Sequence, residues 1–124
     1  MNNPLLAAAD LSFQQEVRSF FGRELAPRAA AIEEQQDWNA VQAAVQAVGA
    51  AGYLRLMFPE LYRGALGTPG LTHATLLSEE AAYVNYAFET TIATALSCAY
   101  ALHRNANPAL RDRYLTPIVD GRAI

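Results

Sequence analysis

The side chains that could do chemistry in this sequence are few, and their spacing does not assemble them. His73 and His103 are the only histidines. Each could serve as a base or a ligand, but neither has a His, Cys or acidic partner at metal-binding spacing. The helix dipole favours a positive charge such as His103 at the end of a helix, without any further function. We therefore interpret both histidines as structural and predict no metal site.

The acidic and nucleophilic residues are also isolated. Glu79 and Glu80 are adjacent, so on a helix they point about 100° apart and cannot act on one atom as acid and base. We expect one to be solvated and the other to pair with an arginine or a backbone group. Ser97 and Cys98 have no base nearby, which favours a role in the core over catalysis. No catalytic residue is predicted.

Gly64, Gly67 and Gly70 form a G-x-x-G-x-x-G run. This is not the fingerprint that holds a dinucleotide, and no strand–helix unit surrounds it. We interpret the three as turn glycines within an ordered loop spanning residues 53–70, which is longer than most connections in a compact domain. No cofactor-binding residue follows from the spacing.

Length and composition indicate one domain that shares an apolar surface. The chain has 124 residues, is 52% apolar and only 17% charged, against about a quarter charged in ordinary domains. Some of this apolar surface is therefore expected to lie under another domain or chain. A net charge of −3 and the lack of a Lys/Arg run argue against nucleic-acid binding.

Three further features concern location. No apolar run approaches the roughly 18 residues needed to cross a bilayer, so no membrane span is predicted. The opening MNNPLLAAAD lacks the basic start and cleavage region of a signal peptide. Cys98, the single cysteine, allows no internal disulfide. The expected location is the cytoplasm.

The element around which the chain is organised is a helix predicted over residues 86–104, with no Gly or Pro. Helical spacing places an apolar row along one side, made of Phe88, Ile92, Leu96 and Ala99. A second row of small side chains consists of Ala93, Ser97 and Ala101. A helix apolar nearly all round is normally buried on several sides. We predict that this is the central helix.

The first half of the chain should supply two more helices. Residues 1–10 are expected to form a flexible lead-in. Ser12 and Gln15 then fit a capping box that begins the first helix, which Pro27 bends or interrupts. The next helix is predicted from Trp38, interpreted as a core anchor, to about Ala51, followed by Gly52 as a left-handed C-cap.

The second half of the chain is predicted to supply the remaining helices. A helix is expected over about 72–84, with a tight corner before the central helix. Asn107 and Pro108 mark the start of the last helix, whose apolar face should consist of Leu110, Tyr114 and Ile118. The predicted fold class is all-α, an up-and-down-like helical bundle of about five helices.

Several phrases, taken in order, resemble the N-terminal helical domain of the acyl-CoA dehydrogenase family. They are LSFQQEVRSFFGRELAPRAAAIEE, VGAAGYLRLMFPELYRGALG, LSEEAAYVNYAFETTIATALS and NPALRDRYLTPIVDGRAI. The resemblance covers residues 11–124 and implies one domain of this type there. Arg63 departs from it, because the family usually has Gly at that position.

The resemblance implies a function that this domain shares with others. The family desaturates acyl thioesters: a base removes the α-proton, and the β-hydrogen leaves as hydride to the flavin of FAD. The β-domain and C-terminal helical domain that hold most of the FAD and supply the base lie outside these residues. They would come from a partner chain or from the remainder of a longer protein, and self-association is a further possibility. The substrate would be an acyl-CoA or acyl-carrier-protein thioester.

The resemblance also implies substrate-binding positions, namely Glu89, Thr90, Ala93 and Ser97. Medium-chain members carry a larger acidic residue at the position of Ala93, so the smaller side chain suggests a longer or branched acyl group. Alternatively, Ala93 simply lets another helix approach closely. Two further alternatives remain for the whole domain: a non-catalytic helical protein-interaction module, or part of a related flavin monooxygenase or acyl-carrier-protein dehydrogenase.

Overall fold

The protein is an all-helical bundle, as predicted. The computed structural model describes residues 4–64 and 66–123, which contain no β-strand. Its principal helices are α1 (Ala8–Glu24), α2 (Ala29–Gln35), α3 (Trp38–Ala50), α4 (Leu71–Val84) and α5 (Tyr86–Asn105). A C-terminal helix is built from α6 (Pro108–Leu110), a π turn (Arg111–Leu115) and α7 (Thr116–Val119). No helix in these residues is both long and apolar enough to cross a membrane.

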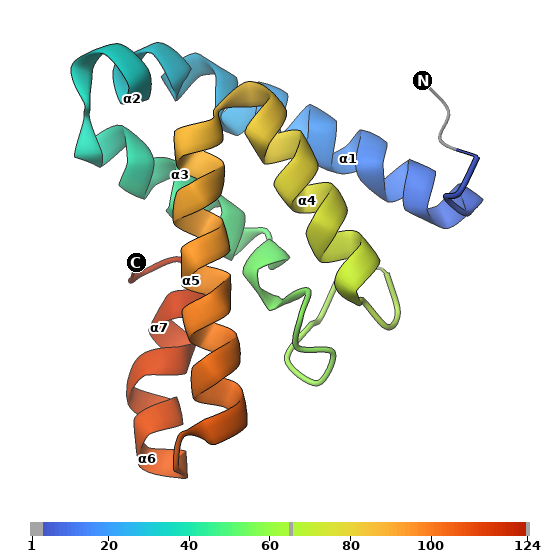
Figure 1. Cartoon of the computed structure of the whole chain (residues 1–124), viewed down its shortest axis with the longest axis vertical. Helices are drawn as coiled ribbons and strands as arrows, with labels where there is room; N and C mark the ends of the chain where they lie inside the picture. The colour runs from blue at the N-terminus through green and yellow to red at the C-terminus, as the bar shows by residue number, and fades with distance from the viewer. Residues whose placement is uncertain (1–3, 65, 124) are drawn as a thin grey trace.

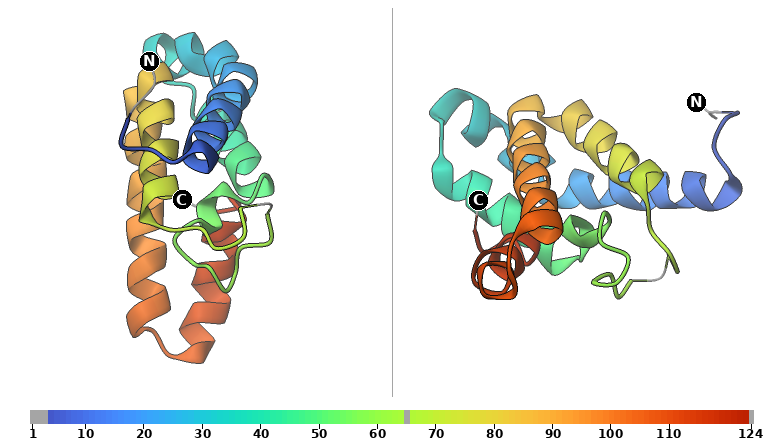
Figure 2. Two further views of the ribbon diagram at one scale, coloured as in Figure 1. Left: turned by 90° about the vertical axis from the view of Figure 1, so that its right-hand side faces the viewer. Right: turned by 60° about the horizontal axis from the view of Figure 1, so that its bottom comes forward.

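Helices α4 and α5 form a V whose arms diverge from a one-residue corner at Asn85 (Figure 1). Helix α1 packs along α4, and the C-terminal helix runs back alongside α5 (Figures 1 and 2). The segment between α3 and α4 folds beneath the open end of the V. Its first part is a 3₁₀ turn (Tyr53–Arg55), and Gly52 before it has the left-handed φ of +82° that was predicted.

The main core is formed where α1, α3, α4 and α5 face one another. From α5, Phe88, Ile92 and Leu96 are buried, and Ala99 is buried in a smaller cluster under the C-terminal helix. The apolar row predicted on the central helix is therefore confirmed. The long loop also contributes its apolar residues, because Leu54, Leu56 and Phe58 are fully buried. Burial of these apolar side chains holds the irregular segment against the helices.

Two details of the first helices differ from the predictions. Helix α1 begins at Ala8, inside the stretch 1–10 predicted as a lead-in, and Asp10 rather than Ser12 serves its first turn. The Asp10 carboxylate accepts the backbone N–H of Ala7 at 3.2 Å. Residues 1–3 lie outside the described part. The interruption predicted at Pro27 is present as a 3₁₀ turn (Ala26–Arg28) between α1 and α2.

The core roles predicted for Trp38, Ser97 and Cys98 are wrong, because all three residues are exposed. Trp38 is 54% exposed. It is the first residue of α3 and stands at the end of the row that Val41, Val45 and Val48 form, beyond the buried part of that row. Cys98 is also exposed. It lies beside the buried row of α5, about 100° round the helix from the buried Ala99. Periodicity showed that α5 was apolar on several sides, but only one of those sides is fully covered in this chain.

The predicted face of the C-terminal helix is displaced by one residue. Leu110 and Tyr114 are each 43% exposed, whereas Leu115 and Val119 are buried. The π turn at Arg111–Leu115 has i→i+5 hydrogen bonds, and this wider turn shifts the register away from that of a regular helix. The predicted start of the helix is confirmed, since the Asn107 side chain accepts the N–H of Leu110 at 3.0 Å.

A charged clamp joins α1 to α4. Glu80 is 4% exposed, and its carboxylate accepts hydrogen bonds from Arg18 at 2.9 and 2.7 Å and from Gln14 at 3.0 Å. The adjacent Glu79 is exposed. The prediction that one glutamate is solvated and the other pairs with an arginine is confirmed. A buried carboxylate needs such partners, because burying an unpaired charge is very costly.

Replacing the cation of this clamp should destabilise the fold. Arg18→Ala leaves the Glu80 charge buried with Gln14 alone, and we expect a loss of about 2 kcal/mol in the free energy of unfolding. Urea denaturation followed by circular dichroism measures it. The control is Arg23→Ala, an exposed cation of the same helix, which should change stability by about 0.5 kcal/mol or less. Equal effects of the two substitutions would contradict the role of the clamp.

Two glycines in helices provide a matched test of backbone packing. A Cβ on Gly49 in α3 would collide with the carbonyl group of Asp120 and the backbone nitrogen of Gly121, whereas a Cβ on Gly22 in α1 meets nothing within 4 Å. Gly49→Ala should therefore cost about 1–3 kcal/mol through overpacking, and Gly22→Ala should stabilise by about 0.5–1 kcal/mol through helix propensity. Thermal unfolding compares them, and a stabilising Gly49→Ala would exclude the close approach.

Candidate functional site

The angle between α4 and α5 is fixed by a buried side chain. Asn85 is 4% exposed, and its carbonyl oxygen accepts the N–H of Phe88 at 2.7 Å as the N-cap of α5. Its amide nitrogen donates to Glu33 of the α2 segment at 2.9 Å. An asparagine directly before an apolar helix is an N-cap signature, so this role could have been found from the sequence. Its second partner could not.

A groove of about 320 Å³ lies between the arms of the V, within the size range of small-ligand sites. Helix α4 lines one side and α5 the other, while Met57 of the long loop contributes from below. The lining residues are Met57, Leu71, Ala74, Thr75, Ser78, Ala93, Leu96, Ser97 and Tyr100. Most of this surface is apolar, and none of the lining residues carries a charge.

The serine and threonine hydroxyls of the groove donate their hydrogens within the protein. Thr75 donates to the carbonyl of Leu71 at 2.9 Å, and Ser97 donates to the carbonyl of Ala93 at 2.9 Å. Ser78 donates across the groove to the Glu89 carboxylate at 2.6 Å. These three hydroxyls therefore leave only acceptor lone pairs for a ligand, and the site is suited to an apolar occupant.

The structure brings together three of the four predicted substrate-binding residues. Ala93 and Ser97 line the groove. Glu89 lies at the edge of the groove, where its carboxylate accepts the hydrogen bond from Ser78. Thr90 faces a different surface, because it is one residue and about 100° further round the helix than Glu89. The lining residues on α4 were missed, although Leu71, Thr75 and Ser78 follow helical spacing. Nothing in the sequence shows that they face α5.

Thr90 lines a second apolar groove of about 420 Å³ on another side of α5. Exposed Trp38 and Cys98 line it as well, together with Thr91, Thr94, Ala95 and Ile118. The apolar surface that composition predicted is present here, around the half-exposed indole of Trp38.

Both histidines have structural partners. His73 accepts the N–H of Gly70 through Nδ1 at 3.1 Å, and its Nε2 lies 3.4 Å from the Asp10 carboxylate. His103 places Nε2 2.6 Å from the Glu60 carboxylate, and its ring meets the edge of Phe58. Among the described residues no three His, Cys, Asp or Glu side chains are grouped as a metal site.

At the start of α4, one of the backbone N–H groups that could hold a flavin pyrophosphate is already used. Such a cofactor places its pyrophosphate on free N–H groups at a helix N-terminus. Here His73 already takes the N–H of Gly70 at the start of α4. Arg63 donates to the carbonyls of Glu60 and Tyr62. Neither the Gly70 N–H nor Arg63 is therefore assigned to the flavin.

Comparison with known proteins identifies one family. The family described as acyl-CoA dehydrogenase, N-terminal domain, matches residues 8–122, which include the whole V and its groove. No curated protein and no solved structure matches the chain.

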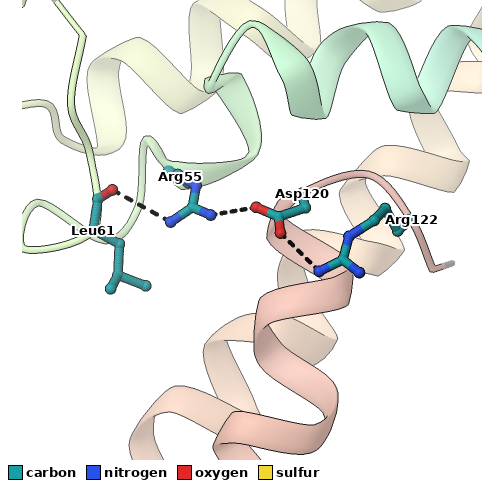
Figure 3. A network of polar contacts seen from close by, with 4 residues as sticks. All are labelled: Arg55, Leu61, Asp120 and Arg122. Carbon is teal, nitrogen blue, oxygen red and sulfur yellow. Dashed lines mark hydrogen bonds and ion pairs between the residues drawn. The ribbon is translucent and has the colours of Figure 1, made fainter.

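A polar network ties the long loop to the C-terminal turn (Figure 3). Asp120 accepts hydrogen bonds from Arg55 through one carboxylate oxygen and from Arg122, at 2.9 Å, through the other. Arg55 also donates to the carbonyl of Leu61 at 3.4 Å. Burial raises the pKa of Asp120, but the hydrogen bonds and charges of the two arginines outweigh this and hold it below its ordinary value. Because the arginines occupy both carboxylate oxygens, we interpret the network as structural.

The network should make stability sensitive to acid. With a folded pKa below the unfolded value of about 3.8, the ionised Asp120 stabilises the fold above that pH, and this contribution disappears as pH falls through the folded pKa. Asp120→Asn should lower the free energy of unfolding at pH 7. As pH falls from about 5 to about 2, the variant should then lose less of its free energy of unfolding than the original chain does. Urea denaturation over this range compares the two chains. If the two chains lose the same free energy of unfolding over this pH range, Asp120 contributes nothing to the acid sensitivity.

Proposed function

The chain belongs to the acyl-CoA dehydrogenase N-terminal domain family, and on this premise we propose that it is the helical domain or subunit of a flavin-dependent enzyme that desaturates acyl thioesters. Its part would be one wall of the acyl pocket. The observation that carries this proposal is the apolar groove between α4 and α5, which contains Ala93 and Ser97. These are two of the positions that resemblance to the family assigns to the acyl tail.

The groove can bind an alkyl chain and keep water away from it. Each methylene removed from water contributes about 0.8 kcal/mol, so a modest length of chain gains useful affinity from shape alone. Because Thr75 and Ser97 donate within the protein, an alkyl chain leaves neither of their hydroxyl hydrogens without an acceptor. No described residue in the groove is a candidate for removing the α-proton. Bound FAD would accept the hydride, and the base would come from other domains.

The size of Ala93 supports a long or branched acyl group. The residue is partly buried and faces the groove rather than the buried row of α5. This placement favours the pocket interpretation over the alternative that Ala93 admits a neighbouring helix. A larger side chain there would fill the narrow part of the groove, because Ala93 is the lining residue of α5 nearest to Asn85.

A non-catalytic helical interaction module is the second candidate. The observation that favours it is the apolar groove around Trp38, a residue 54% exposed, since aromatic side chains in such positions commonly anchor protein interfaces. In the first candidate the same surface would be covered by the β-domain or the C-terminal helical domain. A related flavin monooxygenase or acyl-carrier-protein dehydrogenase would use the same groove with another chemistry.

Co-production with a flavoprotein partner separates the two candidates. The reading frame adjacent to the coding sequence is expressed together with this chain. The enzyme proposal expects a yellow complex that reduces an electron acceptor when an acyl thioester is added. A stable but colourless complex without this activity would favour the interaction module.

Filling the groove should exclude long acyl chains. Ala93→Glu places a larger charged side chain in the groove, so we expect affinity for saturated long-chain acyl-CoA to fall at least about tenfold, or about 1.4 kcal/mol. Short chains should be affected less. Chemical-shift titration of the isolated chain, followed at Ser78 and Ser97, measures the binding. The control is Thr94→Glu, one residue along α5 on the other groove. If Ala93→Glu leaves chain-length preference unchanged, the pocket proposal fails.

A further inference from the structure

The groove between α4 and α5 has a wide end and a narrow end. The two helices meet at Asn85 and diverge from it (Figure 1). Leu71 and Tyr100 line the groove far from the corner, where the helices are furthest apart, and Ser78 lines it nearest the corner. The carrier of an acyl thioester is large and highly charged, so it cannot enter the narrow end. The acyl chain must therefore point its far end toward Ser78.

The narrow end is closed by one hydrogen bond between the helices. Ser78 of α4 donates to Glu89 Oε1 of α5 at 2.6 Å. Because this bond uses the hydroxyl hydrogen, Ser78 presents only acceptor lone pairs to the groove. Directly behind it lies the partly buried carboxylate of Glu89. A ligand end that arrives here meets an acceptor backed by a negative charge.

The two ends of the groove differ in charge. At the wide end the Arg104 guanidinium lies over the ring of Tyr100, 5.9 Å from its centroid. None of the lining residues is cationic, so nothing along the groove could neutralise a second anion. Positive charge at the entrance and negative charge at the closed end suit a molecule with an anionic head and an uncharged tail. A second carboxylate at the far end would face the like charge of Glu89 and be repelled by it.

We propose that the Ser78–Glu89 pair selects acyl chains whose far end is uncharged and rejects chains that end in a carboxylate. This proposal rests on the proposed function, because it takes the groove as the acyl site. Glu89 acts as a specificity-determining residue through Ser78. An alkyl end lies against the small apolar surface beside Ser78, and a terminal hydroxyl can donate to the Ser78 oxygen. A terminal carboxylate can do neither.

Three thioesters of one chain length test the selection. They are the CoA esters of a saturated fatty acid, of its ω-hydroxy derivative and of its ω-carboxy derivative, titrated into the full chain and followed by chemical shifts in the groove. The methyl and hydroxyl forms should bind within about threefold of each other, and the carboxylate form at least about tenfold more weakly. A carboxylate form that binds within threefold of the methyl form overturns the proposal.

A substitution then assigns the selection to its residue. Glu89→Gln keeps the size of the side chain and can still accept from Ser78, but it removes the negative charge. The ratio of the affinities for the methyl and carboxylate forms should fall to about threefold or less. The matched control is Glu79→Gln, which removes an exposed carboxylate of α4. It should leave the ratio of the affinities for the methyl and carboxylate forms unchanged. If this affinity ratio is unchanged in Glu89→Gln, with folding verified by circular dichroism, the proposal is also overturned.

The outcomes separate this proposal from the one beneath it. If no acyl thioester shifts the groove resonances, or if Ala93→Glu does not weaken binding, the acyl site itself is refuted and the selection falls with it. If the methyl form binds and Ala93→Glu blocks it, but the terminal group makes no difference, only the selection is refuted.

Discussion

The buried side chain of Asn85 sets the geometry on which the rest of the structure depends. It ends α4, caps the first turn of α5 and donates to Glu33, so a single residue joins three helical segments. Capping oxygens satisfy N–H groups that would otherwise be stranded at a buried helix start. With the corner fixed in this way, α4 and α5 must diverge along their lengths. The groove is the space left between them.

Helix α5 has a different role on each of its sides. Phe88, Ile92 and Leu96 fill the core, whereas Ala93 and Ser97 line the groove toward α4. The remaining side, near Trp38 and Cys98, forms a second apolar surface. A helix with so few charges can remain in a small domain because each apolar side has, or is shaped for, a covering layer. Family membership and the proposed acyl site account for the first two sides, and a covering domain would account for the third.

Polar contacts between segments far apart in the chain complete the arrangement. The clamp between Arg18 and Glu80 holds α1 on α4, and the Asp120 network holds the long loop against the C-terminal turn. Such contacts contribute little on the surface but matter where one partner is buried, as Glu80 is.

Local patterns in the sequence were enough to predict most of the fold. The apolar row on α5, the cap at Asn107 and the left-handed Gly52 all follow from interactions within a few residues of each other. The fold class and family follow from such elements taken in order. Two kinds of prediction were wrong. Trp38 and Cys98 were assigned to the core because their residue types favour burial. The buried face of the last helix was misplaced because the π turn shifts its register.

What the tertiary structure alone decided is which sides of the helices meet. Periodicity groups Ala93 with Ser97 on one side of α5, but it does not show that Ser78 of α4 faces them or that its hydroxyl bonds to Glu89. It equally does not show that Thr90 belongs to another surface. The sequence by itself determined helices, caps and apolar rows, because these depend on neighbours along the chain. The groove depends on the angle and register between two helices, which only the packing of the whole core fixes.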